Sequence, residues 1–481
     1  MLYSNPEYFI FFLFVWVLYY LVGKTQDTRL WILIAASSFF YVWAGFFDAL
    51  IFAFILVVSW VSVWMAERAH LERSRQFYLA GGIIVMVLHL FFWKYMPWVS
   101  TTVQDVYPAF LGGVKIQFPL PIGISFFTLL GIAYLIDYGR NEAQYVKFKD
   151  YMLFKSFFPQ LVAGPIVRMH QIGPQLRSLP MVNATHLRDG LTLFSIGFFK
   201  KVAIADRMAV VVDPVFSNPA NYTISSILLA LLAYTVQIWG DFSGYTDMGR
   251  GAAKMLGVNL PENFFSPYLS KSPSEFWRRW HVTLSQWIRD YIYIPLGGSS
   301  GGAARTAAVV IITMAISGLW HGAAFTFLVW GLYHGALLAL ERLTKRLGIP
   351  VFEGKAAMIY MLVLIMFGWL IFRSESMASL VTTLLIVSGE IPSGSLRVGT
   401  LSVAWGVACC FLIQFFTYMP LGIDKNQAGR WRSADRVRQA FIASSPIVTA
   451  TLSGVGVAVI IVLSLLMRVS DTSNKFIYFQ F

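Results

Sequence analysis

The apolar residues of this chain are grouped in long stretches separated by short polar segments. A helix that crosses a bilayer needs about 20 mostly apolar residues. Some stretches approach that length, and the shorter ones indicate tilted, broken or re-entrant helices. The apolar stretches are residues 8–22, 30–45, 50–65, 78–93, 122–136, 152–166, 191–205, 227–238, 306–340, 358–372, 401–418 and 448–467. We therefore predict an all-α, polytopic membrane protein with about 11 to 13 transmembrane helices and additional interfacial helices.

The segment from Ser272 to Tyr291 has the pattern of a charged amphipathic helix. Ser272 is a suitable N-cap, Pro273 suits the first helical position, and Glu275 completes a capping box. Three arginines and an aspartate would make this segment costly inside lipid. We expect one helix that lies at the membrane interface or packs against other helices, with its arginines at the headgroups. His281 falls on the apolar face and should point into protein.

The uncharged stretch 306–340 is longer than one crossing requires. It must either turn back on itself or be strongly tilted. Gly318 and Gly322 mark the predicted break, and His321 lies between them. Irregular backbone at membrane depth is tolerated where protein or a water-filled cavity receives it, so we expect His321 to line such a cavity. An ionisable residue at that position is a candidate for function.

Two carboxylates, Asp241 and Asp247, follow the apolar stretch 227–238. Acidic groups at the end of a membrane helix can orient a histidine or bind a cation. They can equally belong to a helix terminus at which Asp241 caps backbone groups and Asp247 pairs with Arg250. Both alternatives stay open at this point.

The composition excludes an ordinary soluble protein, because 57% of the 481 residues are hydrophobic and only 13% are charged. The formal net charge of +13 does not indicate nucleic-acid binding, since the basic residues of membrane proteins gather in cytoplasmic loops and bind anionic lipids. If the basic residues lie on the cytoplasmic side, the N-terminus is expected on the opposite side of the membrane. The stretch 8–22 is expected to be a membrane helix that is kept in the mature protein, not a cleaved signal peptide. The basic residues expected to face the cytoplasm are Arg68, Arg73, Arg75, Lys200, Lys201, Lys345, Arg346, Lys425, Arg430, Arg432, Arg436 and Arg438.

The sequence contains none of the common metal, hydrolase or nucleotide motifs. His321 and His334 lack the four-residue spacing of a shared metal site, and no HExxH, G-x-S-x-G or Walker loop occurs. The only cysteines, Cys409 and Cys410, are adjacent and are predicted to be small core residues. His89 and His334 are each the single histidine of an apolar helix and are predicted to be packing groups. We predict no metal, no bound cofactor, and one membrane-embedded domain over residues 1–481.

The motifs assembled along the chain closely resemble those of the membrane-bound O-acyltransferase (MBOAT) family. The resemblance is strongest to the bacterial branch that contains alginate O-acetyltransferase and relatives acting on cellulose, peptidoglycan and teichoic acids. It covers nearly the whole chain, with a motif core at about 118–373, and is loose over 374–470. The matching segments are residues 121–126, 163–165, 241–245, 262–264, 276–281, 284–285, 289–291, 296–298, 318–322, 330–331, 334–335, 368–369, 372–373 and 476–481.

The resemblance implies a ring of tilted helices around a central funnel that joins the two membrane faces. It also implies transfer of an acyl group from a cytoplasmic thioester to a hydroxyl, with His321 at the position of the catalytic histidine and His281 at that of the second motif histidine. An imidazole with a pKa near 6.5 can remove the hydroxyl proton as a general base. His281 is expected to position a substrate or stabilise oxyanion charge. The residues expected to support the site or line the funnel are Asp241, which could fix a tautomer, Tyr245, Trp320, Trp277, Asn263 and Arg279.

In this interpretation the donor is acetyl-CoA or another acyl thioester, the enzyme lies in the bacterial inner membrane, and the acceptor is an extracellular polysaccharide such as alginate, cellulose or peptidoglycan. The resemblance further implies a separate periplasmic or membrane-anchored partner of the SGNH type, because this chain leaves no room for a soluble domain. Membrane lipids are the other partner, and no nucleic acid is expected. One alternative is a transporter or flippase in which His321 and Asp241 form a proton relay. Another is a family member that acylates a protein or a lipid.

Overall fold

A computed structural model describes residues 2–107, 116, 118–161, 164–179, 182–349, 352–418 and 446–468. The basic cluster at 425–438 and the motif at 476–481 lie outside these residues. The chain divides into two compact units, one formed by Met1–Gly190 with Gly249–Pro261 and the other by Leu191–Met248 with Glu262–Phe481. The single domain over 1–481, the ring of helices and the central funnel stay predictions.

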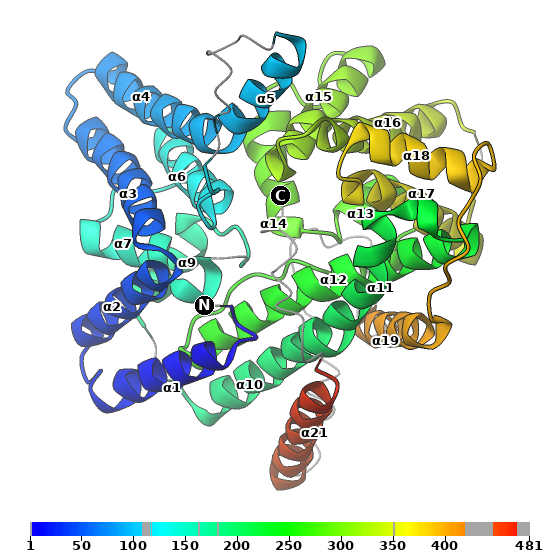
Figure 1. The fold of residues 1–481 in the computed structure, drawn as a ribbon. Coiled ribbons are helices and arrows are strands. Elements are labelled where there is room, and N and C mark those ends of the chain that lie inside the picture. Colours follow the sequence, from blue (N-terminus) through cyan, green and yellow to red (C-terminus); the bar gives the residue numbers. More distant parts are fainter. Residues whose placement is uncertain are drawn as a thin grey trace. The chain divides into compact units, whose positions relative to one another are not determined.

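The first unit contains the N-terminal helices. Within it α3, α4 and α6 pack against one another (Figure 1). The π-helix η1 joins α4 to α5 without a break, so that the whole helical run covers Glu72–Asp105. The helices of this unit are α1 Pro6–Leu21, α2 Gln26–Ala44, α3 Phe46–Glu67, α4 Glu72–Leu90, η1 Phe91–Tyr95, α5 Met96–Val106, α6 Ile124–Gly139, α7 Phe148–Ser156, α8 Phe158–Leu161 and α9 Met169–Arg177.

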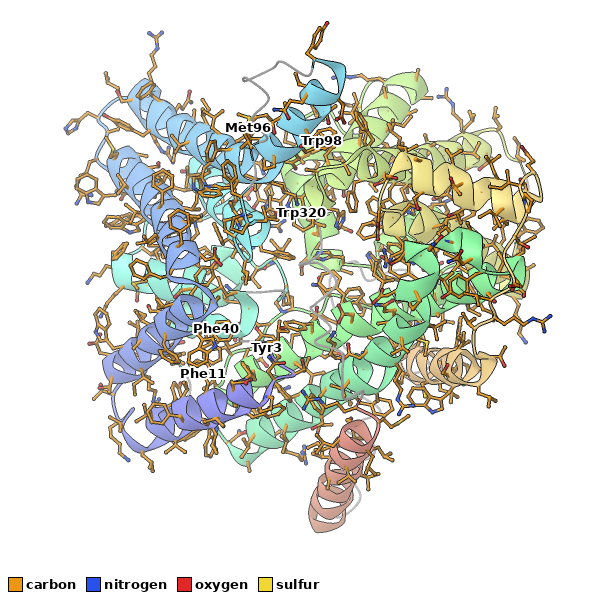
Figure 2. All side chains as sticks on the ribbon, in the orientation of Figure 1. Tyr3, Phe11, Phe40, Met96, Trp98 and Trp320 are labelled. Carbon is orange, nitrogen blue, oxygen red and sulfur yellow. The ribbon has the colours of Figure 1, made fainter. Side chains whose placement is uncertain are left out.

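An aromatic cluster holds the N-terminus of the chain to this unit. The Tyr3 hydroxyl donates to the Phe158 carbonyl at 2.9 Å, and the ring of Phe158 packs on those of Phe11 and Phe40. Tyr3, Phe11 and Phe40 are labelled in Figure 2. The apolar stretch 152–166 is not one continuous helix, because α7 ends at Ser156 and α8 starts at Phe158. Such a break bends the chain so that a short second helix can pack inside the unit.

The second unit contains the remaining helices. Its α15 and α16 form an antiparallel pair (Figure 1). α10 and α12 each run from one unit into the other. The helices are α10 Ala184–Phe199, η3 Lys200–Ala205, α11 Asp206–Ser217, η4 Pro219–Asn221, α12 Ile224–Met255, η5 Pro267–Leu269, α13 Pro273–Trp277, α14 Val282–Ile288, η6 Arg289–Tyr293, α15 Ala303–His321, α16 Phe325–Arg346, α17 Gly354–Arg373, α18 Met377–Ser388, α19 Thr400–Tyr418 and α21 Pro446–Leu466.

The predicted all-helical class is confirmed. Over the described ranges the regular elements are helices, apart from an isolated bridge between Tyr222 and Leu396. Five helices in the described part of the chain are long and apolar enough to cross a membrane, and several shorter apolar helices accompany them. The exact number of crossings stays a prediction.

Candidate functional site

A helical hairpin places His321 at the end of α15. The stretch 306–340 turns back on itself: α15 ends at His321, and α16 starts at Phe325. Glycine at 318 permits this close packing, because a Cβ on Gly318 would lie 2.1 Å from the Phe327 carbonyl oxygen and 3.0 Å from the Cα of Gly331. The break predicted from the glycine pattern is therefore confirmed, and of the two alternatives the structure has the turn rather than one tilted helix.

Aromatic rings surround the His321 side chain, which is only 5% exposed. Its ring centroid lies 4.9 Å from that of Trp320, 5.0 Å from that of Trp330 and 5.5 Å from that of Phe372, with ring planes inclined by 74–86° (Trp320 is labelled in Figure 2). These edge-to-face contacts restrict how the imidazole can turn. The C-terminal end of a helix also favours positive charge, so the position suits an imidazole that takes up a proton.

His281 lies at a break that the sequence did not predict. The expected continuous helix over 272–291 is wrong: α13 ends at Trp277, and His281 has a left-handed backbone conformation with φ of 42°. The cause is the segment around Asn263. Its carbonyl oxygen accepts from the Val282 N–H at 3.0 Å, and its side-chain Oδ1 accepts from the Thr283 N–H at 3.1 Å. These N–H groups therefore cannot donate to the carbonyl oxygens four residues earlier, as they would in a continuous helix.

The predicted start of this segment is confirmed, since the Ser272 hydroxyl accepts from the Glu275 N–H at 3.3 Å. The expectation that the arginines lie at the headgroups is wrong for Arg279, which is 4% exposed. Its guanidinium donates to Glu275 Oε1 at 2.8 and 3.0 Å and to the Phe265 carbonyl at 2.9 Å. Arg279 thus joins α13 to the segment that carries Asn263.

The predicted burial of His281 is confirmed, because its side chain is 1% exposed. Burial lowers the pKa of His281 to about 3, so the imidazole is neutral at pH 7. Its ring packs edge-to-face on Phe242 at 4.6 Å, and its Nδ1 lies 3.4 Å from Asn263 Oδ1. The Trp320 ring lies 6.3 Å from the His281 ring and 4.9 Å from the His321 ring, so one indole contacts both histidines.

Trp277 belongs to the same aromatic assembly. Its ring lies 5.7 Å from that of Trp330 and 5.2 Å from that of His334. His334 is 1% exposed and lies 4.9 Å from Trp330, the ring that also contacts His321. His334 was predicted to be a packing group, and its position beside Trp330 was not predicted. The signal that could have placed it is the four-residue spacing from Trp330, which puts both residues on one face of α16.

The acidic pair of α12 is not at a helix end. α12 continues to Met255, so the helix-terminus interpretation is wrong. Asp241 Oδ1 lies 2.6 Å from Lys201 Nζ, and Asp247 Oδ2 lies 2.7 Å from Lys200 Nζ. The expectation that both lysines face the cytoplasm is wrong as well, since they are buried against α12.

Close backbone packing explains these buried ion pairs. A Cβ on Gly244 would lie 2.7 Å from the Gly197 carbonyl oxygen, so glycine lets η3 and the end of α10 approach α12. Lys201 also reaches Asp206 at 2.7 Å. Asp241 therefore neutralises a lysine of the packed helices, and its expected role in fixing a histidine tautomer stays a prediction. Tyr245, one turn further along α12, is fully buried.

Arg68, Arg73, Lys345 and Arg346 are exposed. Over the described ranges, no three His, Cys, Asp or Glu side chains are grouped as metal ligands.

Comparisons with known proteins agree with these motifs. The sequence profile of the membrane-bound O-acyltransferase family matches residues 124–379. The chain is 36% identical over 440 residues to a probable alginate O-acetylase of Pseudomonas aeruginosa, covering 88% of this chain and 83% of the relative. It is 34% identical to the Azotobacter vinelandii protein of the same name, covering 99% of both chains, and 33% identical to a peptidoglycan O-acetyltransferase of Helicobacter pylori, covering 71% of this chain and 70% of the relative.

The matched profile covers more than half of the chain, and the similarity extends over most of each of these relatives. This identifies an enzyme rather than the transporter considered above. The chain belongs to the membrane-bound O-acyltransferase family and is a multi-pass membrane enzyme that uses an acyl donor.

Proposed function

We propose that this enzyme transfers acetyl groups from a cytoplasmic thioester, acetyl-CoA, across the bacterial inner membrane for O-acetylation of an extracellular polysaccharide. The names of its relatives support this proposal, since they are O-acetylating enzymes of alginate and of peptidoglycan. Both of these acceptors are extracellular polymers that present hydroxyl groups. The proposal therefore commits to a sugar hydroxyl as the final acceptor and to an acetyl group as the cargo.

In the proposed reaction His321 is the general base. Its neutral imidazole removes the proton of the attacking hydroxyl while the oxygen bonds to the thioester carbonyl carbon. The carbon–sulfur bond then breaks, and the imidazolium returns the proton to the departing thiolate. General-base assistance of this kind contributes about 10²- to 10⁴-fold to a rate.

One observation carries this assignment: His321 is the last residue of α15, at the tip of the hairpin, and three aromatic rings enclose it. The helix end stabilises the positive charge that proton uptake creates by about 0.3–1 kcal/mol. This effect is larger in the transition state than in the ground state, as catalysis requires.

The proposed orientation places the N-terminus outside the cytoplasm. Arg68 and Arg73 follow the third helix and are exposed, and so are Lys345 and Arg346 at the end of α16. Exposed basic residues next to membrane helices favour the cytoplasmic side. We also propose that an SGNH-type partner receives the acetyl group outside and completes its transfer to the polymer.

The test replaces His321 by alanine in detergent-solubilised protein supplied with acetyl-CoA, the SGNH-type partner and an oligosaccharide acceptor. We expect His321→Ala to insert and fold normally but to lose at least about 10²-fold of the acetyl transfer. His89→Ala is the matched control, because His89 also lies on an apolar helix, where it stacks on Phe54. Transfer by His321→Ala at the rate of the control would refute the assignment.

A further inference from the structure

The side-chain amide of Asn263 has an orientation that chemistry determines. Its Oδ1 lies 3.1 Å from the backbone nitrogen of Thr283 and 2.8 Å from the Thr283 hydroxyl oxygen. A backbone N–H can only donate, so the amide atom facing it must be the oxygen and not the NH₂ group. The usual ambiguity of asparagine orientation is therefore removed at this position.

The same oxygen determines the proton position on His281. Nδ1 of the imidazole lies 3.4 Å from Asn263 Oδ1, and a carbonyl oxygen can only accept. A bare Nδ1 would set two lone pairs against each other, whereas Nδ1–H adds a hydrogen bond. A neutral imidazole carries one proton, so a proton on Nδ1 leaves Nε2 with a lone pair.

We propose that Asn263 is a positioning residue that holds His281 in the Nδ1–H tautomer, so that Nε2 accepts a hydrogen bond from a second O–H or N–H group of the acceptor, beside the hydroxyl that attacks the thioester. This inference rests on the proposed acyl transfer. It assigns His281 a role opposite to the oxyanion stabilisation expected from the sequence, because a neutral imidazole of this tautomer has no proton on Nε2 to donate. His281 then orients the acceptor through that second group, and His321 removes the single proton of the attacking hydroxyl.

The remaining atom of the amide supports a polar ligand at this place. Asn263 is fully buried, and its Nδ2 has no hydrogen-bond partner among the residues that the structure describes. A buried donor without an acceptor is unfavourable, and in native proteins such groups usually bind a ligand or water. Asn263 Nδ2 can donate to a carbonyl or hydroxyl oxygen of the substrate that His281 contacts.

The test reads the proton position directly. The purified enzyme is labelled with ¹⁵N-histidine, and the ring signals of His281 are identified as those missing from His281→Gln. We expect a protonated Nδ1 and a bare Nε2 in the wild type and in Thr283→Val, which keeps the Asn263 oxygen. In Asn263→Leu we expect a mixture of both tautomers and a kcat about tenfold lower, the effect of one well-made hydrogen bond.

Thr283→Val is the matched control, because it removes a hydrogen bond to the same oxygen without removing the oxygen itself. If Asn263 only shaped the turn, both variants would keep the Nδ1–H signal, and that result would overturn the proposal. A wild-type proton on Nε2 would overturn it as well. The spectrum needs no acyl transfer, whereas failure of the proposed function would show as absence of acetyl transfer in the wild-type assay.

Discussion

A methyl group at position 318 should open the hairpin that carries His321. Gly318 faces α16, and a Cβ there would lie 2.1 Å from the backbone oxygen of Phe327. The backbone of a packed helix cannot relieve this clash by changing rotamer, as a flexible side chain can. Gly318→Ala therefore has to move α15 and α16 apart locally.

The size of the movement follows from this distance. An ordinary contact begins at 3.4 Å, so the two helices must separate by about 1.3 Å, the difference between 3.4 and 2.1 Å. Overpacking of this kind costs about 1–3 kcal/mol. The movement also draws Trp330 of α16 away from His321, whose rings are now 5.0 Å apart. A misplacement of about 1 Å at a reacting group can cost about 10²-fold in rate.

The matched control is Gly81→Ala. Gly81 is also inside a helix, and no atom lies within 4 Å of the position that its Cβ would take. Alanine is favoured over glycine in a helix by about 0.5–1 kcal/mol, so this variant should be as stable as the wild type or more so, and fully active. We expect Gly318→Ala to lose about 10²-fold of acetyl transfer and to unfold at a lower temperature, measured in the same detergent. Equal activity of the two variants would refute the argument that hairpin packing positions His321.

Three further predictions concern other contacts. Lys201→Met should lower the free energy of unfolding by about 3–5 kcal/mol, because it leaves Asp241 buried without the lysine cation. The double variant Lys201→Met/Asp241→Leu should recover most of this loss. Equal unfolding midpoints for the single and double variants would contradict the prediction. His281 lies outside the helices that are long enough to cross a membrane. Burial lowers its pKa from 6.5 to about 3, so between these two pH values the unfolded state binds a proton that the folded state does not bind. Stability should therefore fall as the pH falls below 6.5, by about 2 kcal/mol at pH 5, and thermal unfolding at pH 5 and 7 should show a smaller fall in His281→Gln. Trp330→Leu should reduce kcat about tenfold, because one aromatic contact with His321 contributes about 0.5–1.5 kcal/mol. Trp330→Phe should keep most of the wild-type kcat. Equal rates of the two variants would argue against a role for the ring.

The sequence predicted those features that local chemistry determines. The N-cap at Ser272 and the hairpin break beside His321 follow from residues next to them in the chain, and both are confirmed. The break before His281 could not be predicted in this way, because residues 278–281 include neither glycine nor proline. It depends on Asn263, which lies 18 residues earlier and binds the N–H groups of the segment only in the folded chain.

The charged residues of η3 and α12 were also predicted wrongly, because their partners are distant in the sequence. A pair of lysines in an apolar chain is typical of a cytoplasmic loop, and glycine beside aspartate is typical of a helix end. Lys201 and Asp241 are 40 residues apart, and each makes the other acceptable inside the protein. The glycines near them, among them Gly244, allow close packing and do not end α12. Neither ion pairs between distant residues nor the packing role of a glycine can be recognised from local pattern alone.

The two histidines are both buried, but only His321 lies at the C-terminal end of a long helix, and this difference bears on how their proposed roles divide. His321 is at the C-terminal end of a 19-residue helix, where a positive charge is stabilised. His281 is in a buried turn that disfavours the charged imidazole, and in the proposed tautomer its Nδ1 donates to the Asn263 oxygen. When two titratable groups of one site lie in different environments, one can transfer a proton while the other only forms hydrogen bonds. In the proposed mechanism the proton therefore moves to His321 while His281 stays neutral, and exchanging these roles would require a charge on His281, whose burial opposes it.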